Sequence, residues 1–253
     1  IALKGFAYAN KEKGNHIITS KIEHPAILET CKTLERQGFE VSYINVNEDG
    51  IIDVEELRKS IKTNTILISV MTANNEVGTV QPIEEIAKIA HDNNIVFHTD
   101  AVQAIGNVRI DVEKMKIDML SLSSHKINGP KGVGALYIKN GIEVEKFING
   151  GHQEKDRRAG TENVAGIVGI GKAAEIARKN METHIRNLSK IRDYYIKKVQ
   201  KEIPNIRING SMENRLPGNA NISFKGINAS ELIFKLDERG ICVSSGSACS
   251  SGI

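Results

Sequence analysis

Hydrophobic and polar positions change period repeatedly along residues 17–140 of the chain. Short apolar runs rich in β-branched residues predict strands at 16–20, 40–46, 65–71 and 95–100. Amphipathic stretches predict helices at 25–37, 54–61 and 82–94. Because strands that alternate with helices form βαβ units, we expect an α/β fold with a mainly parallel sheet and helices on both of its faces.

The pattern changes near residue 163. A long helical pattern over about 163–201 is followed by short apolar runs and by a further helix near 230–239. We therefore predict two domains, a large one over residues 1–164 and a smaller α+β domain over residues 165–253. No run approaches the roughly 18 apolar residues that a membrane span needs, so we expect no association with a membrane.

Composition and charge narrow the classes of partner. The 253 residues carry a formal net charge of only +3, and the basic residues are scattered among acidic ones, so a nucleic-acid-binding protein is not expected. Three cysteines without a C-x-x-C pair argue against a disulfide framework and against a zinc site. We expect no metal, and a reducing cytoplasm as the compartment.

Conspicuous polar side chains lie at the ends of four predicted strands, three of those above and a fourth in the stretch "LSLSSHK". They are His24, Asn75, Asp100 with Gln103, and the group Ser123, His125 and Lys126. Ligands of parallel α/β sheets bind at the carboxyl ends of the strands, so we expect these four ends to converge on one site.

Lys126 and Asp100 permit two interpretations each. The lysine could form a salt bridge with Asp100, but the small residues and backbone donors around it in 123–134 suit a bound anion. The alternative is a lysine that forms a Schiff base with a phosphate-bearing cofactor. Asp100 could be a helix N-cap, or the carboxylate that keeps a cofactor ring nitrogen protonated.

The last two cysteines lie in different surroundings. Cys242 stands between Ile241 and Val243, which predicts a buried strand residue. Cys249 is surrounded by serine, glycine and alanine, a composition typical of an exposed loop. A free cysteine can also be buried and inert, but here we expect Cys249 to be a reactive thiol, since the thiolate is the nucleophilic form.

Five stretches together resemble a known family. In chain order they are "ANNEVGTVQPI", "HTDAVQ", "SSHKINGPKGVGALYI", "RRAGTENVAGIVG" and "VSSGSACSSG". They are similar to those of cysteine desulfurases of the NifS/IscS type, which belong to the class V aminotransferases within the fold-type I pyridoxal phosphate enzymes. The resemblance covers nearly the whole chain. It implies a fold-type I transferase fold, pyridoxal 5′-phosphate as cofactor and a homodimer.

The resemblance also implies a role for each matching residue. Lys126 would bind the cofactor covalently and move the α-proton of the substrate, and His24 would stack on the cofactor ring and assist proton transfer. Cys249 would take sulfur from L-cysteine as a persulfide, leaving L-alanine. The remaining cofactor contacts implied are Asp100 at the ring nitrogen, Gln103 at the phenolic oxygen, Asn75 at the ring or substrate, Ser123 and His125 at the phosphate, and Thr161 at the phosphate of the partner subunit.

The roles of the histidines and the identity of a partner protein are less well defined. The two histidines His24 and His125 could instead be ordinary hydrogen-bonded residues at a helix start and in a loop. His98 is predicted to be a packed strand residue, and His152 has no predicted role beyond a contact across a dimer. The resemblance further implies a sulfur-acceptor protein, such as an iron–sulfur scaffold, as partner.

Rival functions remain open at this point. A selenocysteine lyase or a cysteine sulfinate desulfinase would use the same cofactor residues, and a non-catalytic scaffold for sulfur acceptors is a rival of another class. The string "GIGKAA" from Gly169 fits a dinucleotide-binding pattern, but no predicted strand precedes it. In the family pattern a phosphate-binding loop precedes Ile1 and a substrate-binding arginine follows Ile253, so we expect this chain to be a fragment.

Overall fold

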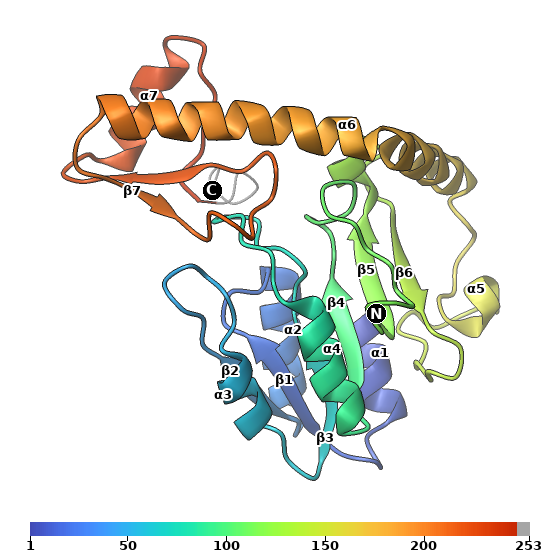
Figure 1. Ribbon diagram of the computed structural model, residues 1–253. Helices are drawn as coiled ribbons and strands as arrows, with labels where there is room; N and C mark the ends of the chain where they lie inside the picture. Colours follow the sequence, from blue (N-terminus) through green and yellow to red (C-terminus); the bar gives the residue numbers. More distant parts are fainter. Residues whose placement is uncertain (247–253) are drawn as a thin grey trace.

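A computed structural model describes residues 1–246 of the chain and contains two β-sheets (Figure 1). The strands are β1 (His16–Ser20), β2 (Glu40–Ile44), β3 (Thr65–Ser69), β4 (Val96–Asp100), β5 (Met119–Ser123), β6 (Gly134–Ile138), β7 (Ile206–Asn209) and β8 (Asn221–Phe224). The helices are α1 (Ala2–Ala9), α2 (Pro25–Glu35), α3 (Val54–Lys59), α4 (Ile83–Asp92), α5 (Gln153–Asp156), α6 (Val164–Glu202) and α7 (Ala229–Asp237), with a 3-10 turn η1 (Ser124–Ile127).

The large sheet has the strand order β2-β1-β3-β4-β5-β6. Its first five strands are parallel to their neighbours, so the predicted mainly parallel sheet is confirmed. Strand β6 is antiparallel to β5, which the sequence pattern did not predict. Only residues 124–133 connect these two strands, and a parallel pair requires a crossover of about a dozen residues or more.

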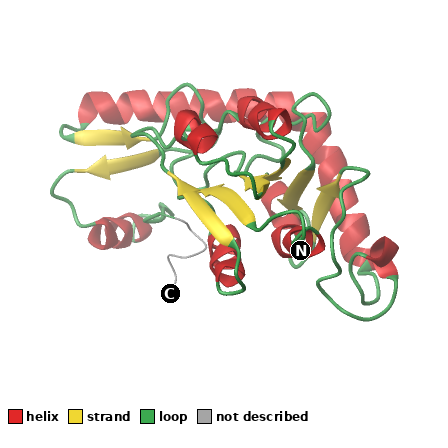
Figure 2. Ribbon diagram, turned by 90° about the horizontal axis from the view of Figure 1, so that it is seen from below, coloured by secondary structure: helices red, strands yellow, loops and turns green. Residues whose placement is uncertain are grey.

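Hydrophobic side chains of the parallel strands bury both faces of the sheet. Ile17 and Leu67 point into one core together with residues of α1 and α2. The next residues along these strands, Ile18 and Ile68, belong to a second core that contains residues of α3 and α4. Successive side chains of a strand point to opposite faces, so continuous apolar strands require helices on both sides. Figure 2 shows these helices around the strands from below.

The second half of the chain is built around one long helix. Helix α6 has 39 residues, contacts η1 of the large sheet and extends over the small β7-β8 sheet (Figure 1). Its limits lie within one residue of the predicted helix. The predicted domain boundary at 164/165 falls in its first turn, and this boundary stays a prediction.

A loop of the small sheet is hydrogen-bonded to the loop between β3 and α4. The Val80 N–H donates to the Asn214 carbonyl at 2.8 Å, and the Leu216 N–H donates to the Gly78 carbonyl at 2.8 Å. The side chains of Asn219 and Asn221 both donate to the carbonyl of Glu76, at 3.0 and 3.1 Å. The small sheet therefore holds the loop that carries Asn75.

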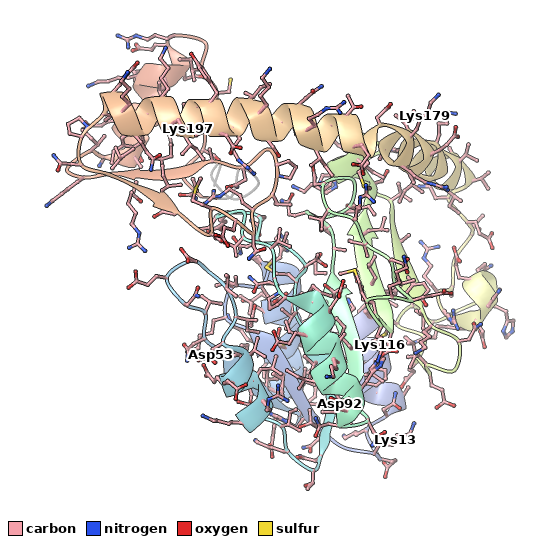
Figure 3. All side chains as sticks on the ribbon, in the orientation of Figure 1. Lys13, Asp53, Asp92, Lys116, Lys179 and Lys197 are labelled. Carbon is pink, nitrogen blue, oxygen red and sulfur yellow. The ribbon has the colours of Figure 1, made fainter. Side chains whose placement is uncertain are left out.

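Charges are distributed over both parts of the molecule. Figure 3 shows the charged side chains, with Lys13, Asp53, Asp92 and Lys116 labelled around the large sheet and Lys179 and Lys197 on α6. Within the described residues no helix is long and apolar enough to cross a membrane.

The prediction for Cys242 is wrong. Its side chain is exposed, and residues 241–246 form no strand after α7. Alternating apolar residues bury a side chain only where the segment pairs with a sheet that packs against a core. Here the small sheet contains β7 and β8 alone among the described residues, so Cys242 has no sheet face to pack on.

Candidate active site

The four polar strand ends lie next to one another in the structure. Strands β1, β3, β4 and β5 are consecutive parallel neighbours, so their carboxyl ends share one edge of the sheet. Backbone hydrogen bonds continue beyond the strands, from the Thr72 N–H to the Asp100 carbonyl at 2.8 Å and from the Ala101 N–H to the Ser121 carbonyl at 2.9 Å. The four strand ends thus lie along one edge of the sheet, while their convergence on one site and the roles of the individual side chains remain predictions.

Asp100 is the last residue of β4 and is only 8 % exposed. Burial raises the pKa of its carboxyl, while the Val102 N–H, which donates to Oδ1 at 2.9 Å, and the nearby His24 act in the opposite direction. It caps a turn and not an α-helix. Within residues 1–246 Asp100 forms no ion pair, so a cation placed here would stabilise its charged form.

Lys126 lies in η1, directly after β5, and is half-buried. Its amine has no hydrogen-bond or ion-pair partner in the described part of the chain, so the salt bridge with Asp100 is absent there. Lys126 lines a cavity of about 220 Å³ together with Asn107 and His184. An amine without a fixed partner at the carboxyl edge is available for a ligand.

The turn around Lys126 supplies polar groups at close range. Ser123 Oγ and His125 Nδ1 are 2.8 Å apart. The hydroxyl of Ser124 is buried and has no hydrogen-bond partner in the described part of the chain. A Cβ atom on Gly129 would lie 2.1 Å from this hydroxyl, so the close approach of the turn requires glycine.

His24 is exposed and caps helix α2. Its Nδ1 accepts a hydrogen bond from the Ala26 N–H at 3.1 Å, and Pro25 occupies the first turn of the helix. The alternative of an ordinary histidine at a helix start is thus partly right. The cap assigns Nδ1 as an acceptor and leaves Nε2 for other contacts.

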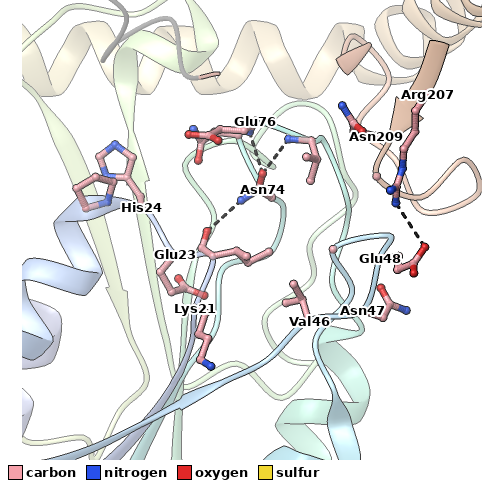
Figure 4. A pocket seen from close by; sticks show the side chains of 16 residues that line it. Lys21, Glu23, His24, Val46, Asn47, Glu48, Asn74, Glu76, Arg207 and Asn209 are labelled. Atoms are coloured by element: carbon pink, nitrogen blue, oxygen red, sulfur yellow. Dashed lines mark hydrogen bonds and ion pairs between the residues drawn. The ribbon is translucent and has the colours of Figure 1, made fainter. Parts of the chain in front are cut away.

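A cavity of about 580 Å³ lies beside His24 and Asn75 (Figure 4). Its opposite wall is formed by Arg207 and Asn209 of β7, and Arg207 forms an ion pair with Glu48 at 3.5 Å. Neither Lys126 nor Asp100 lines this cavity. His24 and Asn75 therefore share one cavity, and Lys126 borders another.

Three predicted residues have few or no described contacts. Gln103 is half-buried in the turn after β4, and its carbonyl accepts a hydrogen bond from Asn107 at 3.2 Å. Thr161 is exposed in the loop before α6, and its carbonyl accepts from Arg158 at 3.5 Å. Cys249 lies outside the described residues.

His98 and His152 differ in their surroundings. His98 is fully buried between Ser69 Oγ at 2.8 Å and Ser121 Oγ at 2.9 Å, which confirms a packed strand residue. Burial lowers the pKa of His98 to about 3, so the ring is neutral at physiological pH. His152 is exposed and pairs with Asp156 at 3.1 Å.

Glu23 and Asn74, the immediate neighbours of His24 and Asn75, were not predicted from the sequence. Glu23 is 4 % exposed and Asn74 is 5 % exposed. A glutamate and an asparagine in polar segments carry no sequence signal of burial, since both residue types are usually on the surface. Only the packing of the two loops reveals them.

The residues at this edge fit pyridoxal 5′-phosphate. Asp100 is a buried carboxylate without a cation, and Lys126 is an amine without a partner in the described residues. The unpartnered Ser124 hydroxyl and the Ser123–His125 pair suit a phosphate group. The donor set thus matches a cofactor that presents a cationic ring nitrogen, an aldehyde and a phosphate.

Comparisons with known proteins show the family of the chain. The sequence matches the family described as aminotransferase class-V over residues 1–253. It is 55 % identical over 252 residues to the cysteine desulfurase IscS of Clostridium botulinum, covering 99 % of this chain and 64 % of that protein. The chain thus spans less than two thirds of that relative.

Two solved structures have the same fold. One is described as a NifS-like protein and superposes with a TM-score of 0.92 at 40 % identity, covering 96 % of this chain and 67 % of the other. The second is described as SspA in complex with cysteine, with a TM-score of 0.81 at 39 % identity, covering 99 % and 70 %. Both likenesses extend over nearly the whole chain.

Proposed function

This chain belongs to the aminotransferase class-V family, and from that premise we propose that its protein is a pyridoxal phosphate-dependent cysteine desulfurase. It would convert L-cysteine to L-alanine and hold the sulfur as a persulfide. The observation that carries the proposal is the convergence of four strand ends, which brings the lysine, the buried carboxylate and the histidine of the family pattern to one edge of the sheet. The cysteine desulfurase names among the relatives support the choice of reaction.

When bound, the cofactor supplies an electron sink for the bonds broken at the substrate. Asp100 would hold the protonated ring nitrogen, and the Ser123–His125 pair would hold the phosphate with the Ser124 hydroxyl beside it. Gln103 would donate to the phenolic oxygen. Burial raises the pKa of Asp100, so a nearby cation is needed to stabilise its charged form. The protonated ring nitrogen of the cofactor would be that cation.

Lys126 would bind the cofactor and then act as the base that removes the α-proton of cysteine. An amine works as a base only when it is neutral, and the Lys126 amine has no carboxylate partner within the described residues. His24 would stack on the ring, and its Nε2 is available for proton transfer because Nδ1 is occupied by the Ala26 N–H. Asn75 would hold the ring or the substrate.

Cys249 would receive the sulfur. Its thiolate attacks the sulfur atom of the bound cysteine, an S–S bond forms, and the bond between Cβ and sulfur of the substrate breaks. The electron pair of that bond remains with the carbon side, and one proton converts Cβ to the methyl group of alanine. One cysteine and one enzyme thiol thus give one alanine and one persulfide, with no external oxidant.

The partners follow from the same proposal. A persulfide must be passed on, so a sulfur-acceptor protein such as an iron–sulfur scaffold is expected. Thr161 would contact the phosphate of a second subunit in a homodimer, and its exposure supports this role. A cytoplasmic location is supported by the three cysteines without a disulfide pattern.

Two alternatives need separate tests. A selenocysteine lyase or a cysteine sulfinate desulfinase would use the same cofactor site, and turnover of the three substrates under one set of conditions distinguishes them. A non-catalytic scaffold would lack cofactor chemistry. One of the similar solved structures is described as SspA in complex with cysteine, and this similarity favours cysteine as the substrate.

The direct test of the site is borohydride reduction. The purified protein is incubated with pyridoxal phosphate, reduced, digested and analysed by mass spectrometry. We expect the cofactor on the peptide that contains Lys126, and none on this peptide in Lys126→Ala. Attachment at another lysine, or none, contradicts the proposed site.

A further inference from the structure

Glu23 links the ends of two neighbouring strands from a buried position. It lies between the end of β1 and His24, which caps α2. Its Oε1 accepts hydrogen bonds from the Ser20 hydroxyl at 2.6 Å and from the Met71 N–H at 2.9 Å. Met71 follows β3, so the carboxyl of Glu23 spans from the loop after β1 to the loop after β3.

Asn74 makes the reciprocal connection. Its Nδ2 donates to the carbonyl of Ile22, in the loop after β1, at 3.0 Å. Its Oδ1 accepts from the N–H groups of Glu76 and Val77, each at 2.9 Å, and so fixes the turn around Asn75. Figure 4 shows these contacts beside the cavity. Each loop thus sends one buried side chain to the backbone of the other.

We propose that Glu23 and Asn74 are positioning residues, which fasten the His24 loop to the Asn75 loop and so set the places of His24 and Asn75 over the cofactor. The proposal rests on the proposed function, since it concerns the same site. It adds two residues that touch neither substrate nor cofactor and act through their neighbours.

The need for such a clamp follows from the exposure of His24. Its ring is exposed, and its one side-chain hydrogen bond within the described residues is to the Ala26 N–H of its own helix. Core packing therefore does not fix it. A displacement of about 1 Å in a positioned group can cost on the order of a hundredfold in rate, so a buried anchor one residue away has a measurable effect.

Glu23 holds the loops as a neutral acid. Burial raises the pKa of Glu23 to about 8, the negative charge of Asp100 acts in the same direction, and the bonds from Ser20 and Met71 oppose it. Cys31 of α2 is the other titratable group affected by Glu23, and burial raises its pKa to about 12. Oε1 accepts both hydrogen bonds, and Oε2 has no hydrogen-bond partner within residues 1–246.

A glutamine should therefore replace this residue better than any other. Its carbonyl oxygen can accept from Ser20 and Met71, and its amide takes the place of the protonated oxygen. Alanine removes the acceptor and leaves the buried Met71 N–H without a partner. The glutamine variant thus keeps the hydrogen bonds that the alanine variant removes.

The experiment measures the affinity of the purified protein for pyridoxal phosphate and the visible circular dichroism of the bound cofactor, in Glu23→Ala, Glu23→Gln and Asn74→Ala. The matched control is Asp118→Ala at the opposite end of the sheet, where Oδ2 accepts from the Phe97 N–H at 3.0 Å. Thermal unfolding of each protein without cofactor reports the loss of stability alone.

We expect Glu23→Ala and Asn74→Ala to lose about tenfold or more in affinity and to change the dichroism, and Glu23→Gln to restore most of the affinity. A loss of about tenfold corresponds to one net hydrogen bond. Asp118→Ala should lose stability and keep its affinity. If Glu23→Ala unfolds, Asn74→Ala tests the same clamp, and unchanged affinity and dichroism in the folded variants overturn the proposal.

Amide exchange separates this proposal from the proposed function. If the unsubstituted protein binds no pyridoxal phosphate, the proposed function fails, but the clamp still predicts faster exchange of the Val77 N–H in Glu23→Ala. Val77 belongs to the opposite loop, so it responds only if the two loops are fastened together. Unchanged exchange at Val77 would overturn the clamp by itself.

Discussion

Ser123 Oγ lies 2.8 Å from His125 Nδ1, a contact that joins the last residue of β5 to the turn that carries Lys126. The pair places a hydroxyl and an imidazole within hydrogen-bond distance of each other, next in sequence to a lysine that has no partner of its own in the described residues. The Ser123 hydroxyl and the His125 imidazole can both donate hydrogen bonds to a phosphate. The imidazole does so when its Nε2, the nitrogen that does not contact Ser123, carries a proton.

Removal of one member of the pair should weaken cofactor binding. We expect Ser123→Ala to bind pyridoxal phosphate at least about tenfold more weakly, because a hydrogen bond to a charged group contributes about 1.5–3 kcal/mol. The matched control is Ser42→Ala, whose hydroxyl contacts His16 Nε2 at 2.9 Å in another part of the sheet. Equal affinity in both variants, measured by fluorescence titration, would exclude Ser123 from the phosphate site.

Asp100→Asn tests the role of the buried carboxylate. Asparagine can keep the hydrogen bond from the Val102 N–H, but it cannot stabilise a protonated ring nitrogen by charge. We expect the cofactor to remain bound, with alanine formation from cysteine reduced by about a hundredfold or more. Alanine formation within about twofold of the unsubstituted protein would contradict the assignment of Asp100.

Much of this site was predictable because strands at the centre of a parallel sheet have a strong signal. The runs that form β1 and β3 are fully buried and rich in β-branched residues, and their limits were predicted within two residues. Once the strands are known, their order brings the residues that follow them to one edge. Lys126, Asp100, His24 and Asn75 could therefore be grouped from the sequence.

Other features depend on contacts that no local pattern encodes. Cys242 has the neighbours of a strand residue, yet it is exposed because the segment finds no strand to pair with among the described residues. Strand β6 is antiparallel because its connection is short. Glu23 and Asn74 are polar residues whose burial follows only from the approach of two loops distant in sequence.

The buried His98 makes stability depend on pH. Burial lowers its folded pKa to about 3, whereas the unfolded value is about 6.5, so below pH 6.5 only the unfolded chain takes up the proton. The contribution of His98 to stability is therefore complete above pH 6.5 and is lost as pH falls toward 3. At pH 5 the loss is about 2 kcal/mol.

Urea unfolding at pH 7.5 and pH 5 checks this expectation. We expect His98→Asn to lose less stability between the two pH values than the unsubstituted protein. Burial also lowers the pKa of His16, to about 4, so the stability of the variant should still depend on pH in part. The exposed His184 provides the control His184→Gln, which should leave the pH dependence unchanged. An identical pH dependence in His98→Asn would mean that His98 is not the buried neutral group described above.

Gly78 is required where the two sheets meet. Its φ is +80°, and a Cβ atom would lie 2.5 Å from Cγ of Asn219, whose amide bonds the Glu76 carbonyl. Gly38 has a similar φ of +89°, and no atom lies within 4 Å of a Cβ there. Gly38→Ala therefore measures the cost of the backbone conformation alone. We expect Gly78→Ala to lower the free energy of unfolding by about 1–3 kcal/mol more than Gly38→Ala. Equal losses in urea unfolding would show that the contact with Asn219 is dispensable.

In the proposed reaction, sulfur moves from L-cysteine to Cys249 with the help of Lys126. The most direct measurement is a single turnover with L-cysteine, followed by mass spectrometry of the alkylated peptides and quantitation of alanine. We predict that the peptide containing Cys249 gains one sulfur atom, with about one alanine formed per site. Cys242→Ala should behave like the unsubstituted protein, and Cys249→Ala and Lys126→Ala should show no persulfide. Sulfur on Cys242 instead, or persulfide formation that persists in Lys126→Ala, would contradict the claim.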